Sequence, residues 1–90
     1  MNHKKEKINA SPSIVLREEF DDQTLLYDPD TGDTFALNPV GVYIWKLLDG
    51  RHTEREIVNA TINRFANVPA EAPEHVKAFL GDLKNKGYIE

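Results

Sequence analysis

The apolar residues of this chain change their spacing once, at Asn38-Pro39, and that change constrains the fold more than any other feature. Before it lie short extended runs separated by turn-forming residues, which is typical of strands. After it, apolar residues recur every three or four positions, which is typical of amphipathic helices. A chain of 90 residues makes one domain, and strands followed by helices predict an α+β fold.

The part before Asn38 predicts a three-stranded antiparallel meander. In its last run Phe35 and Leu37 share one face, whereas Thr34 and Ala36 share the other. This alternation is typical of a sheet with one buried face. The three predicted strands are residues 14–17, 24–27 and 34–37, with a polar corner at residues 21–23.

The part after this meander predicts three helices. The first begins at Asn38-Pro39, where asparagine is the N-cap acceptor and proline takes the first helical position. Gly50 is placed to end this helix. The second helix begins at a capping box, in which Thr53 and Glu56 satisfy each other's backbone amides.

The third predicted helix follows a corner at residues 67–69, begins at about Ala72 or Pro73, and ends at Gly87. The two closely linked helices before it favour a helix-turn-helix-like half. We therefore predict a winged-helix-like α+β fold, in which a three-stranded antiparallel sheet is followed by a three-helix bundle. The apolar stripe of the third helix consists of Val76, Phe79, Leu80 and Leu83.

The formal net charge is −4 and is unevenly distributed. Residues 1–11 are expected to form a flexible basic tail ahead of a domain at residues 12–90. Residues 17–33 carry seven acidic residues against Arg17 alone. The tail lacks an apolar signal segment, and no run approaches the ~20 apolar residues that cross a bilayer. We expect a cytoplasmic protein with no membrane partner, and the lack of cysteine is compatible with a reducing compartment.

The acidic turn that begins at Asp28 does not have the spacing of a calcium loop. Counted from Asp28, glycine falls at position five instead of six, and position twelve is Pro39 instead of glutamate. The segment fits a hairpin turn. His3, His52 and His75 lack metal-binding spacing, and neither a nucleophile elbow nor a phosphate loop occurs. We expect no catalytic residue, metal or cofactor, and therefore not an enzyme.

Nucleic-acid binding is the alternative that the predicted helices raise. A recognition helix exposes Arg, Lys, Asn or Gln near its start, whereas the third helix begins Ala-Pro-Glu-His-Val. Duplex binding also needs a basic stripe, and the predicted sheet is acidic. We expect no nucleic-acid partner. A small winged-helix-like transcriptional or structural interaction domain stays as the alternative function.

The last predicted strand, residues 34–37, lies at an edge of the meander and carries no charge or proline that would blunt it. One interpretation is that a partner peptide pairs with this edge, and the other is that a helix or the tail covers it. A bound peptide would also need an apolar groove, because ladder bonds of about 1 kcal/mol each do not offset an ordering cost of roughly 1–2 kcal/mol per residue. Val76, Phe79 and Leu83 would supply that groove, although they are also core candidates.

Five pieces of the sequence occur in a familiar order. They are Leu25-Leu26-Tyr27, Phe35-Ala36-Leu37-Asn38, Ile44-Trp45-Lys46-Leu47-Leu48-Asp49-Gly50, Thr53-x-x-Glu56-Ile57-Val58 and Val76-x-x-Phe79-Leu80-x-x-Leu83-x-x-x-Gly87-Tyr88-Ile89. Together they resemble the PqqD family, the pyrroloquinoline quinone biosynthesis protein D family of stand-alone peptide-recognition elements, over about residues 12–90. Gly41 departs from the family pattern, in which alanine or another good helix former is more typical.

The resemblance implies a peptide chaperone that binds the leader of a ribosomally made precursor peptide by strand addition and presents it to a radical SAM maturase. Lys77 and Lys84 would meet acidic leader residues. Trp45 is expected in the core, or in a contact with the enzyme partner or a second copy, and the protein is expected to be a monomer or weak homodimer. The implied peptide-binding residues are Asp33, Thr34, Phe35, Ala36, Leu37, Val76, Lys77, Phe79, Leu80, Leu83 and Lys84.

Overall fold

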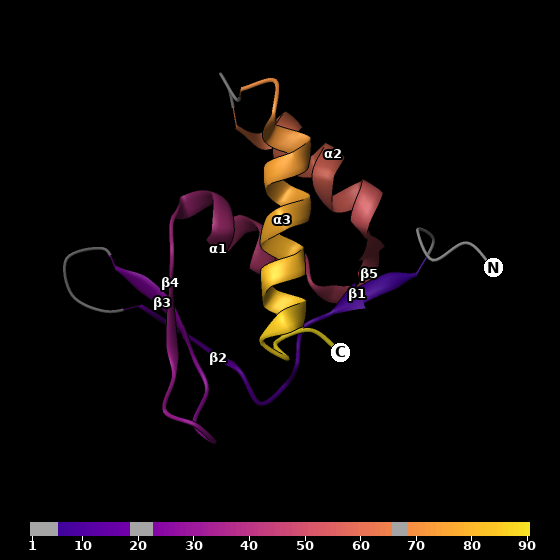
Figure 1. The fold of residues 1–90 in the computed structure, drawn as a ribbon. Helices are drawn as coiled ribbons and strands as arrows, with labels where there is room; N and C mark the ends of the chain where they lie inside the picture. The colour runs from indigo at the N-terminus through magenta and orange to yellow at the C-terminus, as the bar shows by residue number, and fades with distance from the viewer. Residues whose placement is uncertain (1–5, 19–22, 66–68) are drawn as a thin grey trace.

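The computed structural model describes residues 6–18, 23–65 and 69–90. The predicted corners at residues 21–22 and 67–68, and the first five residues of the predicted tail, lie outside the described residues. The described part contains three helices and five short strands, in an α+β arrangement (Figure 1). In chain order these are β1 (Lys7–Asn9), β2 (Val15–Glu18), β3 (Thr24–Tyr27), β4 (Thr34–Leu37), α1 (Pro39–Lys46), β5 (Asp49–Thr53), α2 (Glu54–Arg64) and α3 (Ala72–Asn85).

The strands β2, β3 and β4 form one antiparallel sheet in that order, which confirms the predicted meander. Its register places Leu16, Leu26 and Phe35 side by side across the three strands. Leu37 lies on the same face as Phe35, because alternate residues of a strand point the same way. Leu26 and Leu37 are buried, so this face of the sheet is the one that packs on the helices.

A second sheet corrects the predicted order of elements. β1 pairs antiparallel with β5, and β5 lies between α1 and α2, so the helices do not follow the meander as an uninterrupted bundle. Residues 7–9 were expected in a flexible tail and instead form β1. Backbone bonds also tie this segment to the end of the chain, since Ser11 donates to Tyr88 and Glu90 donates to Asn9, each at 2.8 Å.

The first helix begins as predicted and ends earlier. Asn38 Oδ1 accepts the backbone N–H of Gly41 at 2.7 Å, which caps the helix. The last turn tightens when Leu47 and Leu48 donate to carbonyls three residues back. Gly50 does not end α1; it lies in β5 with φ of +78°, where the pairing with β1 shifts register. The extra residues of this bulge require the positive φ that glycine adopts without strain.

The predicted start of the second helix and the predicted start and stop of the third are confirmed. Glu56 donates its backbone N–H to Thr53 Oγ1 at 3.2 Å, and Thr53 donates its own to Glu56 Oε1 at 2.9 Å, which completes the capping box. α3 stops before Gly87, whose φ of +79° allows Tyr88 N–H to reach back to the Leu83 carbonyl at 2.9 Å. This backbone turn is a common glycine stop.

α3 occupies the middle of the molecule in Figure 1, with the three-stranded sheet on one side and β1 and β5 on the other. Its buried side chains join those of the sheet and of α1 and α2 in one core. Trp45 is buried there, as expected for a packing role. The largest fully buried side chains are Leu26, Ile44, Ile57 and Leu83.

Across the part of the chain that the structure describes, no helix combines the length and apolar content needed to span a bilayer.

Candidate functional site

The outer edge of β4 is open in the described structure. The sheet order leaves β4 hydrogen-bonded to β3 alone, and no described segment pairs with its other side. Of the two interpretations of this edge, the structure therefore supports the uncovered one within residues 6–18, 23–65 and 69–90.

The pattern of backbone bonds shows which residues of β4 face outward. Asp28 N–H donates to the Asp33 carbonyl at 2.9 Å, which makes residues 28 and 33 a hydrogen-bonded pair of the hairpin. Hydrogen-bonded and non-hydrogen-bonded pairs alternate along an antiparallel ladder. Phe35 and Leu37 therefore direct their backbone groups to β3, whereas Thr34 and Ala36 direct theirs to the open edge.

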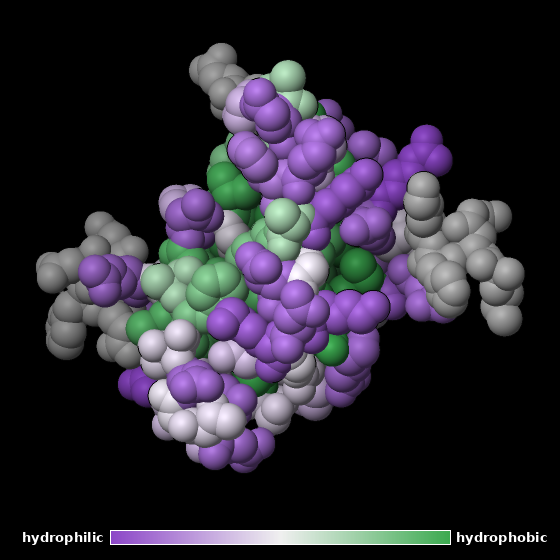
Figure 2. Space-filling view, viewed as in Figure 1, coloured by the Kyte–Doolittle hydropathy of each residue, from purple (hydrophilic) through white to green (hydrophobic). Residues whose placement is uncertain are grey.

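Side chains of β4 and α3 meet beside the open edge of the sheet. The ring centroids of Phe35 and Phe79 are 6.1 Å apart, with an interplanar angle of 36°. Both rings are only half-buried, although they pack against the core. Figure 2 shows hydrophobic side chains gathered between α3 and the three-stranded sheet. We name the half-exposed apolar surface formed by the open edge of β4 and the Phe79 side of α3 the β4–α3 cleft.

Gly41 lies at the end of this cleft nearest α1 and allows α1 to approach β4 and α3 closely. A Cβ built on Gly41 would lie 3.3 Å from Leu37 Cδ2 and 3.4 Å from Phe79 Cζ. These distances are tighter than ordinary van der Waals contact. A larger residue at position 41 would crowd Leu37 and Phe79, so glycine allows the close approach of α1 to β4 and α3.

An apolar hollow of about 260 Å³ continues from the cleft toward α2. Gly41 and Phe79, which border the cleft, also line this hollow together with Val76, and Thr61 and His75 contribute polar atoms to its wall. The hydroxyl of Thr61 donates to the Ile57 carbonyl at 2.7 Å and is satisfied within α2. The hollow is thus suited to an apolar side chain reaching in from the cleft.

The structure separates the predicted residues of α3 into three groups. Val76, Leu80 and Leu83 are buried in the core, and Phe79 alone of the apolar stripe reaches the cleft with its ring half exposed. Lys77 and Lys84 line a different hollow, of about 320 Å³, beside β1 on the other side of α3. The predicted strand residues Thr34, Phe35, Ala36 and Leu37 form β4, and Asp33 immediately precedes it.

The cation that does lie at the cleft is Lys86, which sequence reasoning missed. Its Nζ is 5.1 Å from the centroid of the Phe35 ring. The available signal was the spacing of His75, Phe79, Asp82 and Lys86, which recur every three or four residues and so share one edge of α3. Because this row is largely polar, sequence reasoning overlooked it in favour of the apolar stripe of the same helix.

The acidic hairpin tip approaches the C-terminal end of α3. Burial raises the pKa of the Tyr88 phenol, and the nearby carboxylates of Asp28 and Asp33 raise it further. The tip is ordered by its own turn bonds, in which Asp28 Oδ1 accepts the N–H of Asp30 and Thr31 Oγ1 accepts that of Asp33. It forms the hairpin turn that its proline and glycine predict, with Gly32 at φ of +81°.

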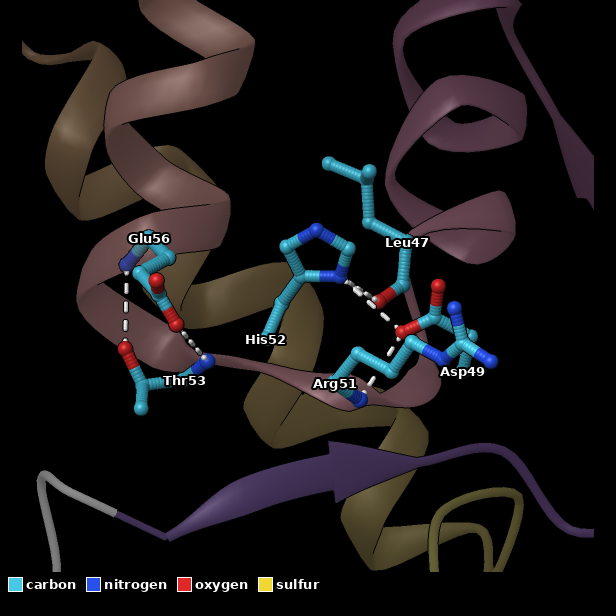
Figure 3. Close-up of polar contacts among 6 residues, drawn as sticks. All are labelled: Leu47, Asp49, Arg51, His52, Thr53 and Glu56. Atoms are coloured by element: carbon cyan, nitrogen blue, oxygen red, sulfur yellow. Dashed lines mark hydrogen bonds and ion pairs between the residues drawn. The ribbon is translucent and has the colours of Figure 1, made fainter.

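A second polar cluster, around His52, stabilises the turn into β5 (Figure 3). His52 Nδ1 is 3.1 Å from the Leu47 carbonyl and 2.9 Å from Asp49 Oδ1. Since both neighbours are acceptors, Nδ1 carries a proton. The backbone N–H of Arg51 and this imidazole together lower the pKa of Asp49. Among the described residues no group of three or more His, Asp or Glu side chains is arranged to hold a metal.

The fold and the open edge of β4 together define a class of small α+β domain. In this class the last strand of an antiparallel meander has an unpaired edge beside the C-terminal helix. Residues 23–89 match the family described as Coenzyme PQQ synthesis protein D (PqqD). The chain belongs to the PqqD family, as the resemblance indicated. Among curated proteins none matches it.

Two solved structures are similar over nearly their whole length. One, described as TbiB1 in complex with the TbiA(beta) leader peptide, is 30% identical with a TM-score of 0.72, covering 91% of this chain and 94% of that one. The other, described as lasso peptide synthetase B1 complexed with the leader peptide, is 18% identical with a TM-score of 0.74, covering 93% and 98%. The second likeness concerns the fold alone.

Proposed function

We propose that this protein binds the leader segment of a ribosomally synthesised precursor peptide by strand addition to β4. The observation that carries the proposal is the open edge of β4 beside the half-buried rings of Phe35 and Phe79. Family membership and the likeness to a protein solved with its leader peptide support it. Such a protein acts by holding and orienting a peptide, so we propose no catalytic role for it.

The outward backbone groups of β4 determine how much binding free energy a peptide gains from hydrogen bonds to this edge. Thr34 and Ala36 offer two N–H and two C=O groups, hence four ladder bonds worth about 1 kcal/mol each. Ordering ~6 peptide residues costs roughly 6–12 kcal/mol. Burial of ~300 Å² of apolar surface adds about 7 kcal/mol, and the β4–α3 cleft is where that burial would occur. Backbone pairing alone therefore does not hold the peptide.

We further propose that the complex presents the peptide to a radical SAM maturase in the cytoplasm, with this chain as a monomer or weak homodimer. Family membership is the support for this step. The face of the sheet away from α3 and the far side of α3 would both stay accessible to an enzyme while the cleft is filled.

The proposal is tested by titrating isotope-labelled protein with the precursor peptide encoded beside its gene. We expect amide shifts at residues 33–37 and along His75, Phe79 and Lys86, with little change in β2, on the opposite edge of the sheet. Saturating peptide without shifts in β4 would contradict strand addition at this edge.

A further inference from the structure

We infer that the bound peptide carries an acidic side chain opposite Phe35 and that Lys86 selects it. This inference rests on the proposed function and adds the chemistry of the ligand. The resemblance implied that Lys77 and Lys84 meet acidic leader residues. We assign that contact to Lys86 instead, because those two lysines line the hollow beside β1.

Lys86 lies at the end of the cleft nearest the C-terminus of α3, and its ammonium has no carboxylate partner among the described residues. It follows the last residue of α3 and is exposed. Its Nζ lies 5.1 Å from the Phe35 ring centroid, and no ion pair joins it to any carboxylate in residues 6–18, 23–65 or 69–90. A cation on an aromatic face keeps its remaining N–H donors available to an acceptor.

The ladder geometry places one peptide side chain directly beside this cation. We take the peptide to pair antiparallel with β4, as β3 does. Thr34 and Ala36 are then the hydrogen-bonding positions of the open edge, so the peptide residue opposite Phe35 occupies a non-hydrogen-bonded pair, with Cα atoms about 4.5 Å apart. Its side chain lies on the same face as the Phe35 ring. It therefore points toward α3, where the Lys86 ammonium rests on that ring.

The next peptide side chain on this face is two residues away and meets an apolar environment. It lies opposite Leu37, whose Cδ2 and the Phe79 ring both border Gly41. The apolar hollow continues from this point. The ligand is thus a peptide in which an acidic residue and an apolar residue are separated by one position.

The neighbouring carboxylates confine the acidic side chain to one register. Asp33 precedes β4 on the same face as Phe35, and Asp82 lies one turn before Lys86 along the same edge of α3. Each disfavours a peptide carboxylate beside itself. Shifting the peptide by two residues toward the hairpin would place its acid beside Asp33 instead of Lys86, so the charge pattern fixes the register as well as the composition.

The test uses a displayed library of random ten-residue peptides, selected on immobilised wild type, Lys86→Glu and Lys84→Glu. Both variants make the same charge change at an exposed position of the same part of the chain, but Lys84 lies on the far side of α3. We expect wild type and Lys84→Glu to enrich Asp or Glu separated by one position from an apolar residue, and Lys86→Glu to enrich Lys or Arg there.

Fluorescence polarisation with a selected peptide then measures the effect. Changing its acidic residue to the neutral amide should weaken binding to wild type about two- to fivefold, the range of an exposed ion pair. Changing it to lysine should weaken binding further, and Lys86→Glu should restore that loss.

The outcomes separate this inference from the proposed function. If wild type enriches no peptide, or the enriched peptides leave the amides of β4 unshifted, the proposed function fails. If peptides bind at β4 but Lys86→Glu keeps the same acid preference as wild type, only the role of Lys86 is overturned. Equal losses of preference in Lys84→Glu and Lys86→Glu would likewise overturn it, because net charge alone would then explain the selection.

Discussion

At the scale of single residues, the two glycines inside helices illustrate opposite packing environments. A Cβ on Gly41 would crowd Leu37 and Phe79, whereas a Cβ on Gly81 would have nothing within 4 Å. Glycine costs a helix interior about 1 kcal/mol relative to alanine. At Gly41 the lower helix propensity of glycine is offset by close contact at the cleft. At Gly81 no close contact offsets it.

We expect Gly81→Ala to raise the free energy of unfolding by about 0.5–1 kcal/mol. Gly41→Ala should give clearly less, because Leu37 and Phe79 must move by tenths of an ångström, and Gly41→Leu should lose roughly 1–3 kcal/mol through overpacking. Urea unfolding of the three variants measures this. Equal gains from the two alanine changes would contradict the close approach at Gly41.

The capping box makes stability depend on pH. The pKa of Glu56 is lowered from its ordinary value of 4.5, chiefly because its carboxylate accepts the backbone N–H of Thr53. The charged form is thus favoured in the folded state, so its contribution is present above the ordinary pKa and is lost as pH falls through the lower native value.

We therefore expect the free energy of unfolding to fall as pH drops from about 5 to about 3, and Glu56→Gln to make that fall shallower. Glu54→Gln, which removes a charge outside the capping box, is the control. Thermal unfolding across this pH range measures both, and a slope in Glu56→Gln as steep as in wild type would rule out this assignment.

At the scale of elements, the open edge of β4 is tested by removing one donor from it. Because Ala36 directs its N–H outward, proline there leaves the β3–β4 pairing intact, as prolines on edge strands do. We expect Ala36→Pro to weaken leader-peptide binding about fivefold or more, through one lost ladder bond and the added ring. Isothermal titration calorimetry measures the loss.

The matched control is Glu18→Pro on the opposite edge of the sheet. Pairing places Val15 and Arg17 in the bonding positions toward β3, so Glu18 also faces outward. Its binding should equal that of wild type. Comparable losses in the two variants would mean that proline acts by disturbing the sheet rather than by blocking the β4 edge.

Local signals explain which elements the sequence predicts well. The Asn38-Pro39 start, the Thr53–Glu56 box and the Gly87 stop each depend on a few adjacent residues, and the structure confirms them. β1 and β5 were missed because both segments are short and polar and because their paired residues lie forty or more positions apart in the chain. No local sequence pattern indicates such a pairing. The same limit explains the misplacement of Gly50.

The candidate site was predicted to a lesser extent, for a related reason. β4 was located correctly because its alternation is a local property. The orientation of α3 depends on how it packs between two sheets, one of which was not foreseen. The prediction therefore placed the apolar stripe of α3 at the groove. In the structure Val76, Leu80 and Leu83 instead face the core, and Phe79 and Lys86 border the cleft.

At the scale of the whole molecule, β1 makes the beginning of the chain part of the fold. Ile8 packs against the core, whereas its neighbour Lys7 is exposed. We expect Ile8→Ala to lower the free energy of unfolding by about 1–3 kcal/mol, since the side chain is partly buried, and Lys7→Ala to change it by less than about 0.5 kcal/mol. Chemical denaturation measures both changes. If residues 7–9 were a flexible tail, neither substitution would alter the free energy of unfolding.

The last described residue meets the end of β1 on the side of α3 away from β4, where the backbone N–H of Glu90 donates to the Asn9 carbonyl. In Figure 1 β1 and the C-terminus lie across α3 from the three-stranded sheet. A linker that continues from Glu90 would therefore start on the side of α3 away from the cleft. A C-terminal tether to an enzyme, a fluorophore or a purification handle would then not compete with the proposed peptide for the edge of β4.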